Sequence, residues 1–310
     1  MSSRPDIVDM WRVWLTAPAM ATDALQEVLG AFGTAVAYGA PALDGTRIDP
    51  GDERLPEVWR IETLSEAEPD ISAVTVAVAE AAGRLGLDVP DIHLDQVPAV
   101  DWLAQNRALF VPVRAGRFFV QATFDETPAP PGSIALRLDA GPAFGSGQHP
   151  TTHGCLTAID GLLRQRRFAR PLDLGCGSGI LALAIAAVQR APVLAIDNDE
   201  WAVRTTRDNA RLNRLAGWVD ARWGDGLRQV PRTAGFDLVC ANILARPLMR
   251  VAPAIAARLA PDGVVVLSGL LDYQEPRVRA AYRAQGLSLV RRITGRSGDG
   301  GLWSTLVLAR

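Results

Sequence analysis

The chain contains 310 residues, of which 48% are hydrophobic and 21% charged, and its 34 acidic and 32 basic residues give a formal net charge of −2. The length predicts two domains, or one large one, with enough apolar material for a sizeable core. The near-neutral charge argues against a protein that binds naked nucleic acid or an anionic membrane surface. Every basic residue is arginine, and the absence of lysine excludes Schiff-base, Walker-type and general-base lysine chemistry.

Residues that bind metals or form disulfides are few and scattered. The three cysteines form no CxxC pair, and His149 and His153 lack the glutamate of an HExxH motif, so we expect neither a metal site nor disulfides. Pro150 directly follows His149 and disfavours a helix through the histidine pair. No apolar run approaches the roughly 18 residues of a membrane span, and the N-terminal segment lacks the charge pattern of a signal peptide. We therefore expect a cytoplasmic protein.

The first hundred residues alternate between the periodicities of strands and helices. We expect strands at 11–16, 34–38, 57–63 and 91–97, and helices at 23–32 and 71–85. The order βαββαβ fits a small ferredoxin-like α+β domain over residues 1–98. Because this domain contains no glycine loop and no cluster of titratable residues, we expect it to have a supporting or recognition role rather than a catalytic one.

A linker is predicted at residues 99–130, with a short helix at 101–107, strand material at 110–123 and a turn-rich break at 127–132. From residue 131 to 310 the pattern is that of an α/β domain. Strands are expected at 171–174, 193–196, 219–223, 236–241, 264–268, 287–293 and 303–308, and helices at 178–188, 200–213, 247–259 and 273–285. The alternation predicts a doubly wound, Rossmann-like sheet of seven strands, with its last two strands antiparallel at one edge.

The sharpest local motif is a glycine loop between the first strand and first helix of this domain, LDLGCGSG, which includes Gly175 and Gly177. Glycine permits close approach of a ligand to the backbone. A dinucleotide site needs a further glycine where this chain has Ile180. The GxGxG form with an acidic residue two positions before the first glycine instead favours S-adenosylmethionine.

Polar residues follow the next strands. Asp197 ends the second strand, where a carboxylate can accept two hydrogen bonds from a ribose diol. Asp225 follows the third strand and could meet an adenine amino group. Asn242 follows the fourth strand in the segment NILA, at the carboxyl edge where open α/β sheets bind ligands. Enzymes that methylate bases carry an aromatic ring there to stack on the flipped base. NILA offers none, so base methylation is disfavoured while another amine acceptor remains open.

The glycine- and proline-rich segment 141–152 precedes the glycine loop. From its spacing alone it is a loop without an assigned purpose, although it could fold over the cofactor as a lid. His149 is the only nearby side chain that could act as a general base. A structural role for it is the favoured interpretation, because a positioned amine that has lost its proton needs no dedicated base.

Four segments, in this order and spacing, resemble the family that methylates ribosomal protein L11: AFGSGQHPTT, LDLGCGSGILA, AIDNDEWAVRTTRDNARLN and ANILARPL. The resemblance spans the whole chain. It implies a class I methyltransferase that transfers methyl groups from S-adenosylmethionine to lysine amines, and to an N-terminal amine, of this large-subunit protein. Ser146 and Gln148 depart from the threonines often found there, and Gln148 could retune the mouth of the pocket.

The resemblance also implies functional residues. Thr152, Gly175, Asp197 and Asn242 occupy its cofactor-contacting positions, with Gly177 in the same loop and Asp225 at the adenine end. Asn242 would also position the acceptor amine. The N-terminal domain would recognise the protein substrate and move about the linker, so that several amines reach one site.

Three alternatives stay open at this point. The acceptor could be a lysine of another cytoplasmic protein, the chain could be a non-catalytic binding module with a degenerate cofactor fold, or, least favoured, it could be an NAD-linked oxidoreductase. The arginine run 164–170 does not by itself indicate contact with ribosomal RNA. It lies at the end of an expected helix, where cations suit the helix dipole and the solvent.

Overall fold

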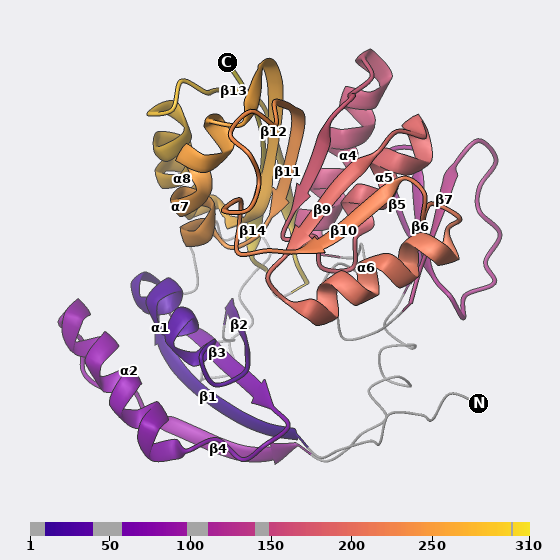
Figure 1. Ribbon diagram of the computed structural model, residues 1–310. Helices are drawn as coiled ribbons and strands as arrows, with labels where there is room; N and C mark the ends of the chain where they lie inside the picture. The colour runs from indigo at the N-terminus through magenta and orange to yellow at the C-terminus, as the bar shows by residue number, and fades with distance from the viewer. Residues whose placement is uncertain (1–9, 40–57, 98–110, 140–148, 299) are drawn as a thin grey trace. The chain divides into compact units, whose positions relative to one another are not determined.

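A computed structural model describes residues 10–39, 58–97, 111–139, 149–298 and 300–310 (Figure 1). The chain divides into two compact units, Met1–Gln105 with Gly298–Gly301, and Asn106–Ser297 with Leu302–Arg310. The helix predicted at 101–107 and most of the predicted lid segment lie outside the described residues.

The described residues of the first unit form an antiparallel sheet, two α-helices and a short 3-10 helix. Its elements are β1 (Met10–Pro18), η1 (Ala19–Ala21), α1 (Thr22–Leu29), β2 (Thr34–Gly39), β3 (Val58–Ser65), α2 (Ile71–Leu85) and β4 (Ile92–Val97). The strand order is β2-β3-β1-β4. Helix α2 has the predicted bounds because Asp70 caps its first turn and the left-handed Gly86 ends it. The elements follow the predicted order, and the ferredoxin-like assignment stays a prediction.

The second unit begins with a three-stranded sheet and a helix that the sequence interpretation did not resolve. These elements are β5 (Val113–Ala115), β6 (Phe118–Ala122), β7 (Ile134–Leu138) and α4 (Pro150–Gln165). The single stretch of strand expected at 110–123 is a hairpin, because the chain turns at Gly116 with φ +59°. Within the predicted linker, β5 and β6 pack into the core of this unit.

The main sheet of the second unit has seven strands in the order β10-β9-β8-β11-β12-β14-β13. Its elements are β8 (Pro171–Leu174), α5 (Ile180–Gln189), β9 (Val193–Asp197), α6 (Glu200–Leu212), β10 (Val219–Trp223), β11 (Phe236–Asn242), α7 (Ala245–Ala256), β12 (Leu259–Leu271), η2 (Asp272–Gln274), α8 (Glu275–Arg283), β13 (Ser288–Arg296) and β14 (Leu302–Ala309). The first five strands pair in parallel. The prediction of a doubly wound α/β sheet is confirmed, as is the antiparallel pairing of the last two strands at one edge.

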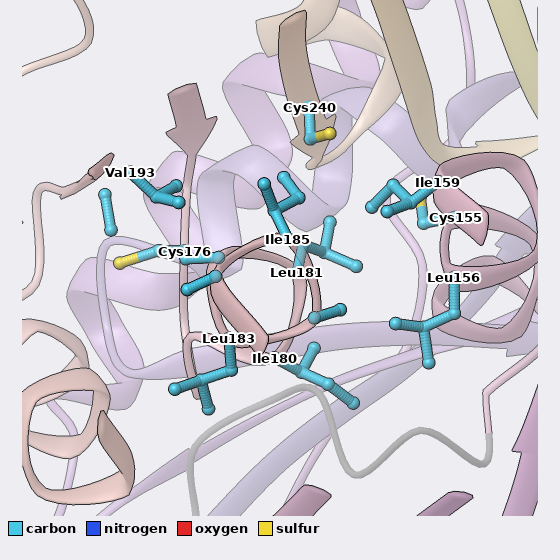
Figure 2. Packing of buried hydrophobic residues seen from close by; sticks show 14 of the residues in the cluster. Cys155, Leu156, Ile159, Cys176, Ile180, Leu181, Leu183, Ile185, Val193 and Cys240 are labelled. Atoms are coloured by element: carbon cyan, nitrogen blue, oxygen red, sulfur yellow. The ribbon is translucent and has the colours of Figure 1, made fainter. Parts of the chain in front are cut away.

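Helices cover both faces of this sheet, each with its own apolar cluster. Residues of α4, α5 and α6 form one cluster, and residues of α7 and α8 form the other. Helix α5 is apolar on all sides, and Figure 2 shows Ile180, Leu181, Leu183 and Ile185 pointing outward around its axis into this packing. A helix that is hydrophobic all round belongs in a core, and here it fixes the end of the glycine loop that precedes it.

The start of α4 corrects the expectation of an irregular loop up to residue 152. Pro150 is the first residue of the helix, and His149 is its N-cap. Proline suits this position because the first helical N–H has no partner within the helix. The proline therefore excludes His149 from the helix, as expected, but it begins a helix that contains Thr152 and His153.

Candidate functional site

The site lies where the strand order reverses. Strand β8 pairs with β9 on one side and with β11 on the other, so the loops that follow these strands diverge at the carboxyl edge of the sheet. Open α/β sheets bind ligands in this kind of crevice. The predicted residues of the glycine loop and those at the ends of β9 and β11 therefore meet at one edge.

The glycine loop has the backbone conformation that its sequence predicts. Gly175 and Gly177 have φ angles of +72° and +53°, a region that residues with a Cβ rarely adopt. A Cβ on Gly175 would also lie 2.3 Å from Cγ2 of Ile243, in the segment that follows β11. Glycine is thus required at position 175 both for its conformation and for the close approach of two strand ends.

Asp197 at the end of β9 holds the loop from the other side. Its Oδ2 accepts a hydrogen bond from the Gly177 N–H at 2.9 Å, and its Oδ1 accepts one from the Asp199 N–H at 3.0 Å. Each carboxylate oxygen can accept more than one hydrogen bond. Both oxygens are oriented by the backbone and keep capacity for hydroxyl donors of a ligand.

Two buried polar residues of α6 support the same loop. The Thr206 hydroxyl donates to the Gly177 carbonyl, and the Asn209 amide donates to the Ser178 carbonyl, both at 2.9 Å. Sequence reasoning missed this role. The available signal was their spacing of three residues, which places both on one face of a helix.

A cavity of about 870 Å³ opens at this edge, within the size range of small-molecule sites. Gly175, Asp197 and Asp225 line it, together with apolar side chains that include Ile196 and Leu244. The cavity therefore combines an oriented carboxylate, a glycine backbone and an apolar wall. This arrangement fits a nucleoside ligand, with the carboxylate available to ribose hydroxyls.

Asn242 and Thr152 lie in contact with each other. The Asn242 Nδ2 donates to the Thr152 hydroxyl over 3.4 Å, and Thr152 is fully buried. The Asn242 Oδ1 is also buried and has no hydrogen-bond partner among the described residues. An unpaired buried acceptor is costly, which indicates that a donor from a ligand belongs beside it.

His149 has a structural role in the conformation described. Its Nδ1 lies 2.8 Å from the Thr151 hydroxyl and caps α4, and its ring meets the Trp303 ring edge-on at 4.6 Å. These contacts hold the beginning of α4, and with it Thr152, against β14. They favour the structural interpretation of His149 over general-base catalysis.

Asp173, the acidic residue of the glycine motif, was not among the predicted site residues. It is 1% exposed, and burial raises the pKa of its carboxyl to about 7. Its Oδ2 accepts a hydrogen bond from the Ala182 N–H at 3.0 Å, whereas its Oδ1 has no partner within the described ranges. A second unpaired acceptor therefore lies in the core beneath the loop.

Two arginines of the run at the end of α4 form ion pairs within the second unit. Arg164 pairs with Asp160 at 3.2 Å, and Arg166 pairs with Asp262 at 2.8 Å.

Among the described residues, no group of His, Cys, Asp or Glu side chains could hold a metal ion. No described helix is long and apolar enough to cross a membrane.

Several known proteins are similar to this chain over most of its length. A ribosomal protein L11 methyltransferase of Rhizobium etli (strain CIAT 652) is 40% identical over 273 residues, which cover 87% of this chain and 89% of that protein. Its counterpart in Rhodopseudomonas palustris (strain BisB5) is 39% identical over 260 residues, covering 83% and 86%. The crystal structure of a ribosomal protein L11 methylase from Lactobacillus delbrueckii subsp. bulgaricus matches with a TM-score of 0.55 and 28% identity, over 64% of this chain and 98% of that one. Residues 11–307 match the family described as ribosomal protein L11 methyltransferase (PrmA), and the chain belongs to that family.

Proposed function

We propose that this chain transfers methyl groups from S-adenosylmethionine to lysine amines, and to the N-terminal amine, of ribosomal protein L11 in the cytoplasm. Family membership supports the reaction and the substrate protein. The observation that carries the proposal at the level of residues is the cavity lined by Gly175, Asp197 and Ile243. Asn242, whose Oδ1 is buried and unpaired among the described residues, directly precedes Ile243 in the chain.

The cofactor would be held by Thr152, Gly175, Gly177, Asp197, Asp225 and Asn242. Asp197 would accept the ribose hydroxyls, since both of its oxygens are already oriented by backbone N–H groups. Asp225 would accept from the adenine amino group at the other end of the cavity. When bound, S-adenosylmethionine supplies an electrophilic methyl group on a sulfonium.

The protein's part in the reaction is to deliver an uncharged amine in line with that methyl group. A lysine ammonium has a pKa of about 10.4 in water, and burial beside a positive charge lowers that pKa. The Asn242 Oδ1 would accept one N–H of the amine and aim its lone pair at the methyl carbon. Positioning of this kind accounts for large rate effects without a general base.

The first unit would recognise the substrate protein, and the boundaries at residues 98 and 130 belong to this proposal. Support comes from its composition, which has no glycine loop, and from its separate core. An acceptor lysine on another cytoplasmic protein is the second candidate, because nothing in the cavity itself selects the protein that carries the amine.

Intact-protein mass spectrometry tests both candidates. Purified ribosomal protein L11, incubated with the enzyme and S-adenosylmethionine, should gain mass in steps of one methyl group, and peptide analysis should place the gain on lysines and the N-terminus. Labelling of other proteins in a cytoplasmic extract, with none on L11, would establish the second candidate instead.

A further inference from the structure

Positive charge is concentrated at the C-terminal end of a chain that is net acidic. The segment Asp272–Arg310 contains seven arginines and three acidic residues, although acidic residues outnumber basic ones in the whole sequence. Six of these arginines are exposed on α8 and β13: Arg277, Arg279, Arg283, Arg291, Arg292 and Arg296. These six arginines line neither the cavity at the carboxyl edge of the main sheet nor the glycine loop.

Four of the arginines follow the seam between α8 and the edge strand β13. Arg279 and Arg283 lie one helical turn apart and line a cavity of about 440 Å³ against the first residues of β13. Arg292 extends from β13 to Glu275 at the beginning of α8. Arg296 follows Arg292 on the same face of the strand, because side chains alternate along it. The four cations therefore form a row along the seam.

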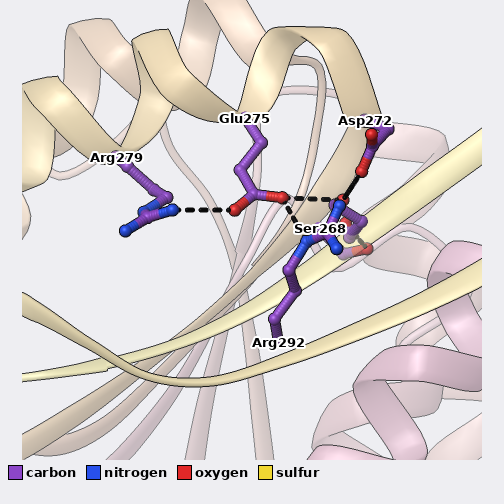
Figure 3. Close-up of polar contacts among 6 residues, drawn as sticks. Ser268, Asp272, Glu275, Arg279 and Arg292 are labelled. Atoms are coloured by element: carbon purple, nitrogen blue, oxygen red, sulfur yellow. Dashed lines mark hydrogen bonds and ion pairs between the residues drawn. The ribbon is translucent and has the colours of Figure 1, made fainter.

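Buried Glu275 and half-buried Asp272 hold two members of this row in place. Figure 3 shows Arg279 and Arg292 on either side of Glu275, which is 5% exposed. Glu275 accepts from Arg279 at 3.2 Å and from Arg292 at 2.6 Å, and Arg292 also pairs with Asp272. The hydrogen bond to Glu275 raises the pKa of Arg292. Each guanidinium has five N–H donors, so these contacts leave donors available to a further anion.

The other arginines of this surface are unpaired. Arg277, Arg283, Arg291 and Arg296 have no ion-pair partner anywhere in the part of the chain that the structure describes. Unpaired like charges on neighbouring elements repel, and a bound polyanion would relieve that repulsion.

We propose that the seam between α8 and β13 binds the phosphodiester backbone of RNA. Guanidinium groups match phosphate oxygens with two parallel hydrogen bonds, and a basic row tracks a backbone of regularly repeated anions. An extended acidic peptide fits less well, because its successive side chains point to opposite faces. The surface is separate from the methyl-transfer site and adds a second ligand class to this chain.

Binding of a fluorescein-labelled single-stranded RNA of about 20 nucleotides to the full chain tests the proposal. Fluorescence anisotropy at about 50–200 mM salt should give a Kd that rises steeply with salt. The double variant Arg283→Glu/Arg296→Glu should raise the Kd at least about tenfold and reduce the slope of log Kd against log salt by about 1.4. Both residues are exposed and unpaired, so the variant should keep the circular dichroism spectrum of the wild type.

The matched control is Arg214→Glu/Arg232→Glu, which makes the same charge change at two other exposed side chains. It should leave the Kd within about threefold of the wild-type value. Equal weakening by both double variants, no salt-dependent binding by the wild type, or equally effective competition by polyglutamate would each overturn the proposal. Methyl transfer by the wild type to ribosomal protein L11, measured in parallel, tests the proposed function on its own.

Discussion

The two polar atoms of the Asn242 side chain have different surroundings. Its Nδ2 contacts the Thr152 hydroxyl, while its Oδ1 is buried without a partner among the described residues. The contact with Thr152 fixes the rotation of the amide, and the unpaired Oδ1 remains available to accept a hydrogen bond. A side chain without the oxygen would lose the positioning effect but would leave the cavity walls in place.

Replacement of Asn242 tests whether its side-chain oxygen positions the acceptor amine. Asn242→Ala should lower kcat for methyl transfer by about 100-fold, the scale of a misplaced reacting group. Asn242→Asp retains an acceptor oxygen, and its second oxygen can accept a hydrogen bond from the Thr152 hydroxyl where the wild-type amide donates one. This variant should keep more of the activity than the alanine variant. Single-turnover methyl transfer and calorimetric cofactor affinity measure the effects. Full transfer and unchanged affinity in Asn242→Ala would remove Asn242 from the site.

Asp173 makes the stability of the protein depend on pH. Burial raises the pKa of its carboxyl from 3.8 to about 7 in the folded state. Between these two values the folded state binds the proton and the unfolded state does not, so the free energy of unfolding falls as pH rises. Above pH 7 the folded state must hold a buried charge, and the stabilising effect of the bound proton is lost.

Asp173→Asn removes this titration. The free energy of unfolding of the variant, relative to the wild type, should rise between pH 4 and 7 by up to about 1.4 kcal/mol per pH unit. Urea unfolding at several pH values measures the difference. Asp88→Asn, at an exposed carboxyl of the first unit, controls for the loss of one acid. A difference between wild type and Asp173→Asn that stays constant with pH would contradict the titration.

At the scale of elements, the glycine loop is held by three neighbours: β9 through Asp197, α6 through Thr206 and the segment after β11 through Ile243. These neighbours are distant from the loop in sequence and hold it from different sides. A displacement of the loop would therefore alter the wall of the cavity and the position of the Asp197 carboxylate together.

Gly175→Ala tests this coupling, and Gly86→Ala at the end of α2 is its matched control. The two glycines have similar φ angles, +72° and +69°, but a Cβ at 86 would meet nothing within 4 Å. Both substitutions should cost about 1 kcal/mol of backbone strain in their own unit. Only Gly175→Ala should also weaken cofactor affinity, at least about tenfold by calorimetry, because its Cβ displaces Ile243. Equal cofactor affinities in the two variants would contradict the coupling.

The elements that the sequence predicted well have strong local signals. Helix α2 has a side-chain cap and a terminal glycine, and β10 has its predicted bounds, 219–223. A helix that ends at the arginine run was expected, but the start of α4 was missed because Pro150 suggested a break, whereas proline in the first turn is a start signal. The loop, Asp197 and Asn242 were predictable because they follow strands, whose carboxyl ends must meet. The supporting contacts of Thr206 and Asn209 were not, since their spacing places both on one face of a helix but does not tell which neighbour that face contacts.

On the scale of the whole molecule, the two units have separate hydrophobic cores. The first is centred on β1, α1 and α2, and the second is built around the seven-stranded sheet. All the residues proposed to bind the cofactor belong to the second unit. A ligand that binds only one folded unit stabilises that unit alone.

S-adenosylhomocysteine, the product form of the cofactor, should therefore raise the Tm of the unfolding transition of the second unit. The Tm of the first unit, measured in the same calorimetric scan, should stay unchanged. At a ligand concentration about 100 times the Kd, the stabilisation is about 2.7 kcal/mol, or about 5–10 °C in Tm for a unit of this size. Leu25→Ala, in the core of the first unit, should lower the Tm of the unshifted transition only. A single transition that moves as a whole in both experiments would contradict independent unfolding.

The three buried cysteines allow opening of the second unit to be followed without an added label. Cys155, Cys176 and Cys240 all lie in the core of the second unit, where burial raises the pKa of each thiol. A thiolate reagent can reach them only when that core opens. Since the chain has no other cysteine, the rate of thiol modification measures the opening of the second unit alone in the intact protein. Cofactor should slow this modification, whereas core substitutions in the first unit should leave its rate unchanged.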